Sequence, residues 1–389
     1  MNQGKSIFRQ LSELVSRYEF KKCVKRYDGN HRVRQFSCYQ QFLCLIFGQL
    51  THRESLRDIV TCLEAQGSGL YHLGLGKGVA RSTFSDANKQ RDWRIFADFA
   101  QYLMQEAATL YTDSEARQFF EESVFALDSS LIRLCIDVFG WAHYRKTKAA
   151  VKMHVMIDVQ TAIPNFFYLS DGLKHDMAVL KTIRFEPGAF YVMDRGYLDF
   201  ASLFRIEEEK AFFVIRAKKN LKFERKTSIP RTEEEKLTIK ADQLGGFTGF
   251  YAAKHYPKQL RRIRAKDPKT GKSIVLLTNN FTLEASKIAE MYRKRWRIEL
   301  FFKWIKQHLR IKTFWGYSSN AVKIQLYTAL SAYLIVAIAR KKLNISTEMH
   351  EILQILSVHI FAKTPLNQLL TKQPSQISKN DSHNQLSIW

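Results

Sequence analysis

The stretch that decides the fold runs from Ile288 to Lys312 and reads IAEMYRKRWRIELFFKWIKQHLRIK. Its apolar residues recur at helical spacing, which predicts one amphipathic helix. At about 100° per residue, four polar side chains of this helix share an arc of roughly 60°. They are Tyr292, Arg295, Glu299 and Lys306, and the opposite side carries Ile298, Leu300, Phe301, Phe302, Trp304, Ile305 and Leu309. One face is therefore buried. The other presents a carboxylate beside two cations and a phenol, although ordinary ion pairs on a solvated face explain such a pattern equally well.

The net charge of this 389-residue chain is +24, from 61 Lys and Arg against 37 Asp and Glu. This excess predicts a polyanionic partner, and nucleic acid is the first candidate because Lys and Arg neutralise phosphates. A membrane surface is the alternative, but the sequence has no lipidation motif and no basic amphipathic helix separate from the core. The hydrophobic content of 46% is typical of a globular protein, and the length suffices for two or three domains.

Three features predict a cytoplasmic protein. No apolar leader follows Met1, and the longest apolar run, Leu326 to Ala339, is too short and too interrupted to span a bilayer. The five cysteines contain no Cys-x-x-Cys pair, which favours reduced thiols over a disulfide framework or a zinc ribbon.

Residues 1–115 read as an all-helical domain. An apolar helix is predicted over Phe36 to Leu50, and Thr51 to Glu54 has the pattern of a capping box that opens a second helix ending at Glu64. The Gly-rich stretch 66–78 lacks the spacing of a nucleotide-binding loop and is predicted to be a plain loop.

A short helix over Ser82 to Arg91 and a longer one after Trp93 complete this region. Short helices joined by a turn in a basic region suggest a DNA-binding module, although many small helical domains share this pattern. The candidate contacts are Arg81, Asn88, Lys89 and Arg91.

From Glu122 the pattern changes to that of an α/β unit with one mixed sheet. Strands are predicted over Val124–Asp128, Val151–Val159, Ile163–Leu169, Ala189–Met193 and Ala211–Ile215, with helices over His175–Arg184 and Leu198–Glu209. Residues 220–271 are polar and turn-rich, which predicts a β-rich insertion before a buried strand at Ser273–Thr278. We expect the helix quoted above to begin at Thr282 as its N-cap, with Glu284 in its first turn.

Two more helices are predicted, over Val322–Lys342 and Glu348–Ala362, followed by a polar tail from Thr371 that we expect to be mobile. The predicted domains are therefore residues 1–115, residues 116–345 and the C-terminal residues 346–389.

Two aspartates lie in unusual positions for acids. Asp128 stands inside an apolar run and Asp194 closes another, just before Gly196. Ligands collect at the carboxyl ends of strands in α/β sheets. With Glu299 from a helix packed on the sheet, these residues would form a carboxylate triad that suits two Mg²⁺ or Mn²⁺ ions. Spacing alone proves nothing among 37 acids; other candidates are Asp137, Asp158 and Asp176, of which Asp158 better fits a turn.

The combined motifs resemble the DDE transposases of bacterial insertion sequences, and most of all insertion sequence family four. The resemblance rests on Asp194-Arg195-Gly196-Tyr197 and on Tyr292-x2-Arg295-x3-Glu299-x6-Lys306, which in that family is called the YREK pattern. The sequence segments 144–148, 152–155 and 277–279 also fit this family. The likeness covers roughly residues 120–340.

The resemblance implies an RNase H-like fold with Asp128 on the first strand, Asp194 after the fourth and Glu299 on the helix beyond the insertion. It implies metal-dependent cut-and-paste transposition at the terminal repeats of a mobile element, by a homodimer bound to DNA at the bacterial nucleoid. The implied DNA contacts are Tyr292, Arg295 and Lys306. We add Trp296, Arg195 and the basic residues Arg145, Lys146 and Lys148, which a solvated charge run would explain equally well.

Two other classes of function stay open at this point. One is a metal-dependent nuclease of the same fold that does not transfer strands. The other is a DNA-binding protein derived from a transposase and lacking catalysis.

Overall fold

The computed structural model describes residues 4–112, 119–145, 148–266 and 271–371, without the side chains of residues 143–148. The N-terminal part is helical, as predicted. Its helices are α1 (Ile7–Glu13), α2 (Arg17–Arg26), α3 (Cys38–Leu50), α4 (Leu56–Glu64), α5 (Gly69–His72), α6 (Arg81–Gln90) and α7 (Arg94–Leu110). The predicted tail from Thr371 lies almost wholly outside the described residues.

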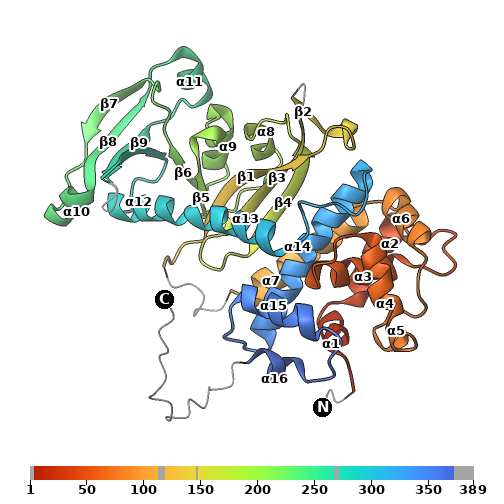
Figure 1. Ribbon diagram of the computed structural model, residues 1–389. Helices are drawn as coiled ribbons and strands as arrows, with labels where there is room; N and C mark the ends of the chain where they lie inside the picture. The colour runs from red at the N-terminus through yellow and green to blue at the C-terminus, as the bar shows by residue number, and fades with distance from the viewer. Residues whose placement is uncertain (1–3, 113–118, 146–147, 267–270, 372–389) are drawn as a thin grey trace, which may run out of the picture.

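Among the described residues, ten strands form one mixed sheet in the order β2-β3-β1-β5-β6-β10-β9-β8-β7, with β4 paired to β3. The strands are β1 (Val124–Leu134), β2 (His143–Arg145), β3 (Lys148–Asp158), β4 (Pro164–Asp171), β5 (Phe190–Met193), β6 (Phe212–Arg216), β7 (Phe223–Ser228), β8 (Ile239–Phe247), β9 (Leu260–Lys266) and β10 (Ser273–Thr278). The central strands β1, β5 and β6 are parallel, and the other pairs are antiparallel. A mixed α/β architecture after a helical region is what the sequence predicts. The strands of the insertion extend the main sheet at one side (Figure 1).

Side chains on successive strand positions enter two different cores, because they point to opposite faces of a sheet. Phe190 and Val192 pack with the N-terminal helices and with α12 (Ala285–Lys294), α13 (Trp296–His308) and α14 (Ser319–Lys342). Tyr191 and Met193 pack on the other face, against α8 (Met177–Leu180), α9 (Phe200–Glu208) and α11 (Phe250–His255). The remaining helices are α10 (Glu233–Thr238), α15 (Met349–His359) and α16 (Leu366–Leu370).

The predicted single helix over 288–312 is wrong in one respect, because it is divided at Arg295 into α12 and α13. The Arg295 amide donates to the Tyr292 carbonyl at 3.2 Å, and the Ile298 amide donates to the Arg295 carbonyl at 3.1 Å. These bonds span three residues, as in a 3-10 helix, so the backbone forms one tighter turn there. The chain then continues in nearly the same direction (Figure 1). The second helix ends at His308.

Two predicted helix starts are also wrong, and each error has a local cause. The cap before α12 is Glu284, because Asn280 Oδ1 accepts from the amides of Thr282 and Leu283 and keeps them outside the helix. In the N-terminal region, the capping box belongs to Ser37 at the start of α3. Thr51 ends that helix, and Ser55 caps α4.

The N-terminal helices share one core with α14 and the sheet. Tyr327 of α14 stacks on Trp93 with ring centroids 5.7 Å apart, and meets Phe167 of β4 edge-on at 5.3 Å. The chain ends are joined as well, because the amides of Ile7 and Phe8 donate to carbonyls at 362 and 360. In Figure 1, α14 lies beside both the N-terminal helices and the sheet.

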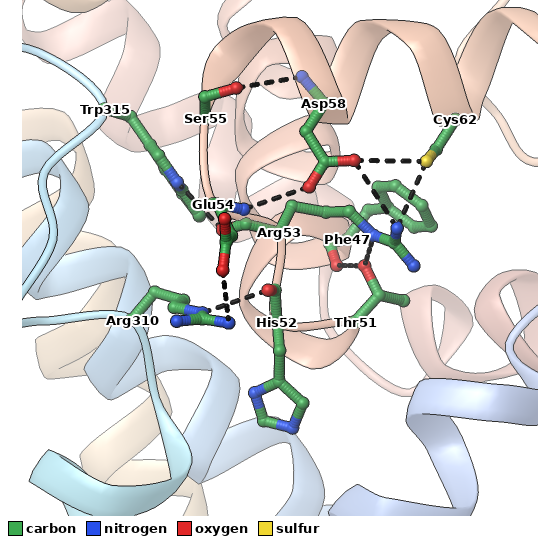
Figure 2. A network of polar contacts seen from close by, with 10 residues as sticks. All are labelled: Phe47, Thr51, His52, Arg53, Glu54, Ser55, Asp58, Cys62, Arg310 and Trp315. Carbon is green, nitrogen blue, oxygen red and sulfur yellow. Dashed lines mark hydrogen bonds and ion pairs between the residues drawn. The ribbon is translucent and has the colours of Figure 1, made fainter.

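A polar clamp joins the turn between α3 and α4 to the segment after α13, as Figure 2 shows. Arg310 donates through Nε to the His52 carbonyl at 3.0 Å, and its amide donates to Gln49 Oε1 at 2.8 Å. Trp315 donates through Nε1 to the Arg53 carbonyl at 3.1 Å. The segment that follows the predicted catalytic helix is therefore held by the N-terminal helices.

One described helix, α14, is long and apolar enough to cross a membrane. It is longer than the apolar run noted in the sequence, Leu326 to Ala339. Its most apolar window is 94% buried inside the protein, as in the core helix of a soluble protein. None of the five cysteines takes part in a disulfide.

Because α14 packs against both the N-terminal helices and the sheet, we expect Leu334→Ala to destabilise the whole chain by about 2–5 kcal/mol. Leu334 is fully buried. Urea unfolding followed by tryptophan fluorescence and by circular dichroism should give one coincident transition that moves as a unit. Val358→Ala, at a side chain that is 77% exposed, is the control and should leave the midpoint unchanged. Two transitions of which only one moves would show that the N-terminal helices fold separately.

Candidate functional site

The three predicted carboxylates come from three elements that meet on one face of the sheet. Asp128 lies on β1, Asp194 follows the last residue of β5, and Glu299 lies in the first turn of α13. Because β1 and β5 are adjacent and parallel, and α13 packs on β1, the three side chains lie near one another.

The charges of both other acids act on the pKa of the Asp128 carboxyl group. Burial is the main cause that raises the pKa of Asp128 to about 6, and the negative charges of Glu299 and Asp194 also raise it. The Ser129 amide, which donates to Asp128 Oδ1 at 2.8 Å, and the Arg295 guanidinium act in the opposite direction. A partly buried carboxyl group with a raised pKa beside two other acids is typical of a functional site.

Arg295 bridges two of the three carboxylates. Its Nη2 donates to Glu299 Oε1 at 2.6 Å, and its Nη1 lies 3.5 Å from Asp128 Oδ2. The Arg295 side chain is only 15% exposed, and its Nε is buried without a hydrogen-bond partner among the described residues. The guanidinium therefore supplies positive charge between Asp128 and Glu299.

Tyr292 and Lys306 complete the polar face that the sequence predicts. The buried Tyr292 side chain places its hydroxyl 3.4 Å from Asp194 Oδ1, to which it donates. Burial raises the pKa of Tyr292, so the phenol stays protonated. Lys306 donates to the hydroxyl of Ser130 on β1, and burial lowers its pKa.

Trp296 is exposed, with 57% of its surface accessible, and does not pack in the core. It lines a groove of about 650 Å³ beside the carboxylates, together with Tyr292 and Arg295. The far wall comes from the sheet and the insertion and includes Arg216 and Lys266. An aromatic surface and several cations thus adjoin the carboxylates. On the helix, Leu300 is exposed as well, unlike the other members of the predicted apolar face that line the core.

The other predicted DNA contacts are less well placed by the structure. Arg195 is exposed next to Asp194, in the short helical turn Arg195–Tyr197. Arg145 and Lys148 pair across β2 and β3 by their backbones. Their side chains and the whole of Lys146 lie outside the part of the chain that the structure describes.

In the N-terminal region, two of the four predicted contacts are wrong. Asn88 is buried and accepts from Gln41 Nε2 at 2.7 Å. The guanidinium of Arg91 donates to Gln41 Oε1 at 2.9 Å and to the Phe36 carbonyl. Both side chains are used by the fold, whereas Arg81 and Lys89 are exposed.

Sequence reasoning missed a second polar network on the opposite face of β1. Asp176, which the sequence offers only as an alternative acid, accepts from the Ser129 hydroxyl at 2.6 Å and from Lys152 Nζ at 3.2 Å. His154 is fully buried and faces this network, and burial lowers its pKa to about 4, so the ring is neutral. Ser129 and His154 are cross-strand partners. Both are polar residues inside otherwise apolar strands, and this pattern in the sequence was a signal for the network. The network holds Ser129, whose amide donates to Asp128.

The remaining alternative acids lie elsewhere: Asp158 accepts from two turn amides, as predicted, and Asp137 is exposed.

The three carboxylates suit a divalent cation in charge and in donor type, since Mg²⁺ and Mn²⁺ prefer oxygen ligands. No group of three His, Cys, Asp or Glu among the described residues lies close enough together to hold an ion as the side chains stand. In this arrangement Arg295 pairs with Asp128 and Glu299, and the Tyr292 hydroxyl donates to Asp194. The residues therefore fit a metal by chemistry, in an arrangement where a guanidinium supplies the positive charge.

Two family models match this chain. Residues 119–335, more than half of the chain, match the family model described as a transposase DDE domain. Residues 3–76 match a second family model, which is described only as a domain of unknown function, DUF4372.

Three curated relatives are named as transposases. A candidate transposase, y4zB, of Sinorhizobium fredii is 36% identical over 66% of this chain and 70% of its own length. The probable transposase of insertion sequence element IS5377 of Geobacillus stearothermophilus is 32% identical over 56% of each chain. A candidate transposase of insertion sequence element IS4SA of Synechocystis is 29% identical over 74% of this chain and 80% of its own. This chain therefore belongs to the family of insertion-sequence transposases that carry a DDE domain.

Proposed function

We propose that this protein catalyses metal-dependent cut-and-paste DNA transposition with Asp128, Asp194 and Glu299 as its catalytic carboxylates. The observation that carries the proposal is the convergence of these three acids from β1, the end of β5 and α13, where two of them raise the pKa of the third. The strand order supports it, because antiparallel strands β1, β3 and β4 are followed by parallel strands β5 and β6. An RNase H-like core is part of the same proposal. The YREK pattern of insertion sequence family four belongs to the same proposal.

The family of DDE transposases generally uses divalent metal ions, and the three carboxylates are the residues that would hold one or two Mg²⁺ or Mn²⁺ ions here. When bound, such ions activate the attacking oxygen and stabilise the leaving oxygen of a phosphodiester. A metal cation would stabilise the Asp128 carboxylate, because partial burial and two neighbouring acids disfavour its negative charge even beside Arg295.

The reaction that we propose has two chemical stages. Water forms a bond to phosphorus at the element end, the bond to the 3′ oxygen breaks, and a 3′ hydroxyl is released. That hydroxyl attacks the phosphodiester of the opposite strand, which forms a hairpin and breaks the P–O bond to the flanking DNA. A second water hydrolyses the hairpin and releases the 3′ hydroxyl again, which then attacks a phosphodiester of the target DNA. Each step exchanges one P–O bond for another, and water is the only co-reactant.

The residues around the carboxylates would hold the DNA strands. Arg295, just before α13, and Lys306, in its last turn, carry the charge that a scissile phosphate requires, as charge-assisted donors on either side of Glu299 in the sequence. Trp296 offers an exposed aromatic surface beside Arg216 and Lys266, which suits a displaced base and its phosphates. Arg195, Arg145, Lys146 and Lys148 remain proposed contacts with the flanking backbone.

The proposed partners are the terminal inverted repeats of the element and a target duplex, with two copies of this chain in the DNA-bound complex. We place the protein in the bacterial cytoplasm at the nucleoid. The N-terminal helices are proposed to share in recognition of the element end. Because they share a core with α14, this role belongs to the whole chain.

Each of Asp128→Asn, Asp194→Asn and Glu299→Gln should reduce cleavage by roughly 100-fold or more and leave DNA binding largely intact. The change removes a ligand charge at nearly constant shape. Cleavage and strand transfer are measured with a labelled end duplex and Mg²⁺, and Asp137→Asn, at an exposed acid, is the control. A variant that cleaves near the wild-type rate excludes that residue from the site. Wild-type cleavage without strand transfer would indicate a nuclease, and absence of any Mg²⁺-dependent cleavage would indicate a DNA-binding protein.

In metal-free buffer, Asp128→Asn should stabilise the protein at pH 8, by an amount on the order of 3 kcal/mol at most. The folded-state pKa of Asp128, about 6, lies above its ordinary value, so the folded protein binds the proton more tightly than the unfolded chain does. The wild type therefore loses stability as pH rises towards and through 6, and the advantage of the Asn variant should disappear near pH 4. Urea unfolding at several pH values measures this, and added Mg²⁺ should stabilise the wild type far more than the variant. A variant less stable than wild type at pH 8 would contradict a buried, unfavourable charge.

We expect the double-strand break to proceed through a DNA hairpin, because the described residues offer one carboxylate cluster per chain for two antiparallel strands. End-labelled duplex with Mg²⁺ should give a foldback product on a denaturing gel. Arg295→Ala should lose that product before it loses nicking, and Trp296→Ala should reduce it roughly 10-fold by removing a stacking surface. Leu300→Ala, an exposed apolar residue one turn away, is the matched control. Clean double-strand ends with no foldback at any time point would refute the hairpin.

A further inference from the structure

A second groove lies away from the carboxylates, between the N-terminal helices and the segment that follows α13. Its volume is about 650 Å³. Arg57 of α4 and Arg81 and Lys89 of α6 line one wall, and Trp315 and Tyr317 line the other. No Asp or Glu is among the residues that line it, so the groove is positively charged.

The three cations of this groove are not used by the fold. Arg57, Arg81 and Lys89 are exposed and form no hydrogen bond or ion pair with any described residue. Nearby arginines behave differently. Arg53 contacts Asp58 in the network of Figure 2, at 3.5 Å, and Arg91 donates to Gln41. The charge that faces the groove is therefore available to a ligand.

Three helices begin at the groove, which adds to its positive potential. Ser55, the N-cap of α4, Arg81, the first residue of α6, and Ser318, the N-cap of α14, all line it. These helices have 9, 10 and 24 residues. Helix N-termini carry partial positive charge and attract phosphate.

The groove is held in shape by the clamp of Figure 2. Gln49 binds the amide and the carbonyl of Arg310, at 2.8 and 3.2 Å. Trp315 lies between the walls and donates to the Arg53 carbonyl. A ligand in the groove would touch both the N-terminal helices and the chain that leaves α13.

The groove continues the charge of the active site. Lys306 is close enough to Arg133 and Lys312 that their charges lower its pKa, after the larger effect of burial. Arg133 and Lys312 are exposed, and Lys312 leads directly into the groove segment. From Glu299 to Leu309 the helix rises about 15 Å, which is roughly half a turn of B-DNA.

We propose that this groove binds the phosphate backbone of duplex DNA leading into the carboxylate site, with Arg57, Arg81 and Lys89 as phosphate contacts. The choice of DNA as the polyanion rests on the proposed function; the site itself rests on the unpaired cations, the helix ends and the fixed walls. Tyr317, 65% exposed and packed edge-on against Phe139, offers an additional donor at the rim.

The test compares two charge-matched variants of the full chain. The first is Arg57→Gln, Arg81→Gln and Lys89→Gln together. The second, the control, is Lys21→Gln, Lys25→Gln and Arg184→Gln, three exposed cations on other elements that do not line the groove. Binding to a fluorescent duplex of the element end is measured in EDTA by anisotropy at several salt concentrations.

The groove variant should lose affinity roughly 10- to 100-fold, and the slope of log affinity against log salt should become shallower by about 2 to 3. The control should change the affinity less than about 3-fold and the slope by less than about 1. Equal effects of both variants, or no effect of the groove variant, would overturn the proposal. Unchanged urea midpoints for both variants show that folding is not the cause.

The two proposals fail separately, because this binding is measured without metal or cleavage. If the carboxylate variants abolish cleavage while the groove variant binds like wild type, the groove proposal is wrong and the catalytic proposal stands. If the groove variant loses binding but the wild type never cleaves with Mg²⁺, the groove stands and catalysis falls.

Discussion

The interaction on which the site depends is the bridge from Arg295 to Asp128 and Glu299. Without a cation between them, two acids beside Asp194 would repel each other in a partly buried place, where such repulsion is poorly screened. Arg295 supplies that cation from the one position where α12 and α13 are divided, so the break in the helix and the charge of the site meet at a single residue. The chain continues from α12 into α13 in nearly the same direction, and the Arg295 side chain is only 15% exposed.

The same helix is tied to the rest of the chain at its far end. Arg310 and Trp315 join the segment after α13 to the turn between α3 and α4, and Tyr327 of α14 packs on Trp93. Hydrogen bonds and packing therefore join the N-terminal helices to the segment next to α13. This explains why the family match to residues 119–335 and the N-terminal match to 3–76 lie in one body rather than in two loosely joined parts.

The sequence predicted the elements well and their ends poorly. Strands such as Phe190–Met193 are short, apolar and bounded by turns, so composition alone locates them. Helix ends depend on competing caps: Asn280 displaced the expected Thr282 cap, and Ser55 took the role expected of Thr51. The contact of Arg295 with Asp128 on β1 is a tertiary contact, which no helical periodicity contains. For the same reason, the exposure of Trp296 and the burial of Asn88 could only be read from the packing around them.

Charge balance explains why a strongly basic chain would place cations both at and far from its carboxylates. Three acids and Arg295 leave the reaction centre negative, and a phosphodiester approaching it is repelled. At physiological salt, charges act over about 8 Å, so the cations of the distant groove cannot cancel that repulsion at the scissile phosphate. They can only hold phosphates elsewhere along the same duplex. Lys306 and Arg295, with bound metal, would then balance the local charge, while the groove supplies affinity. On this view the net charge of +24 divides into a local part that permits chemistry and a distant part that permits binding.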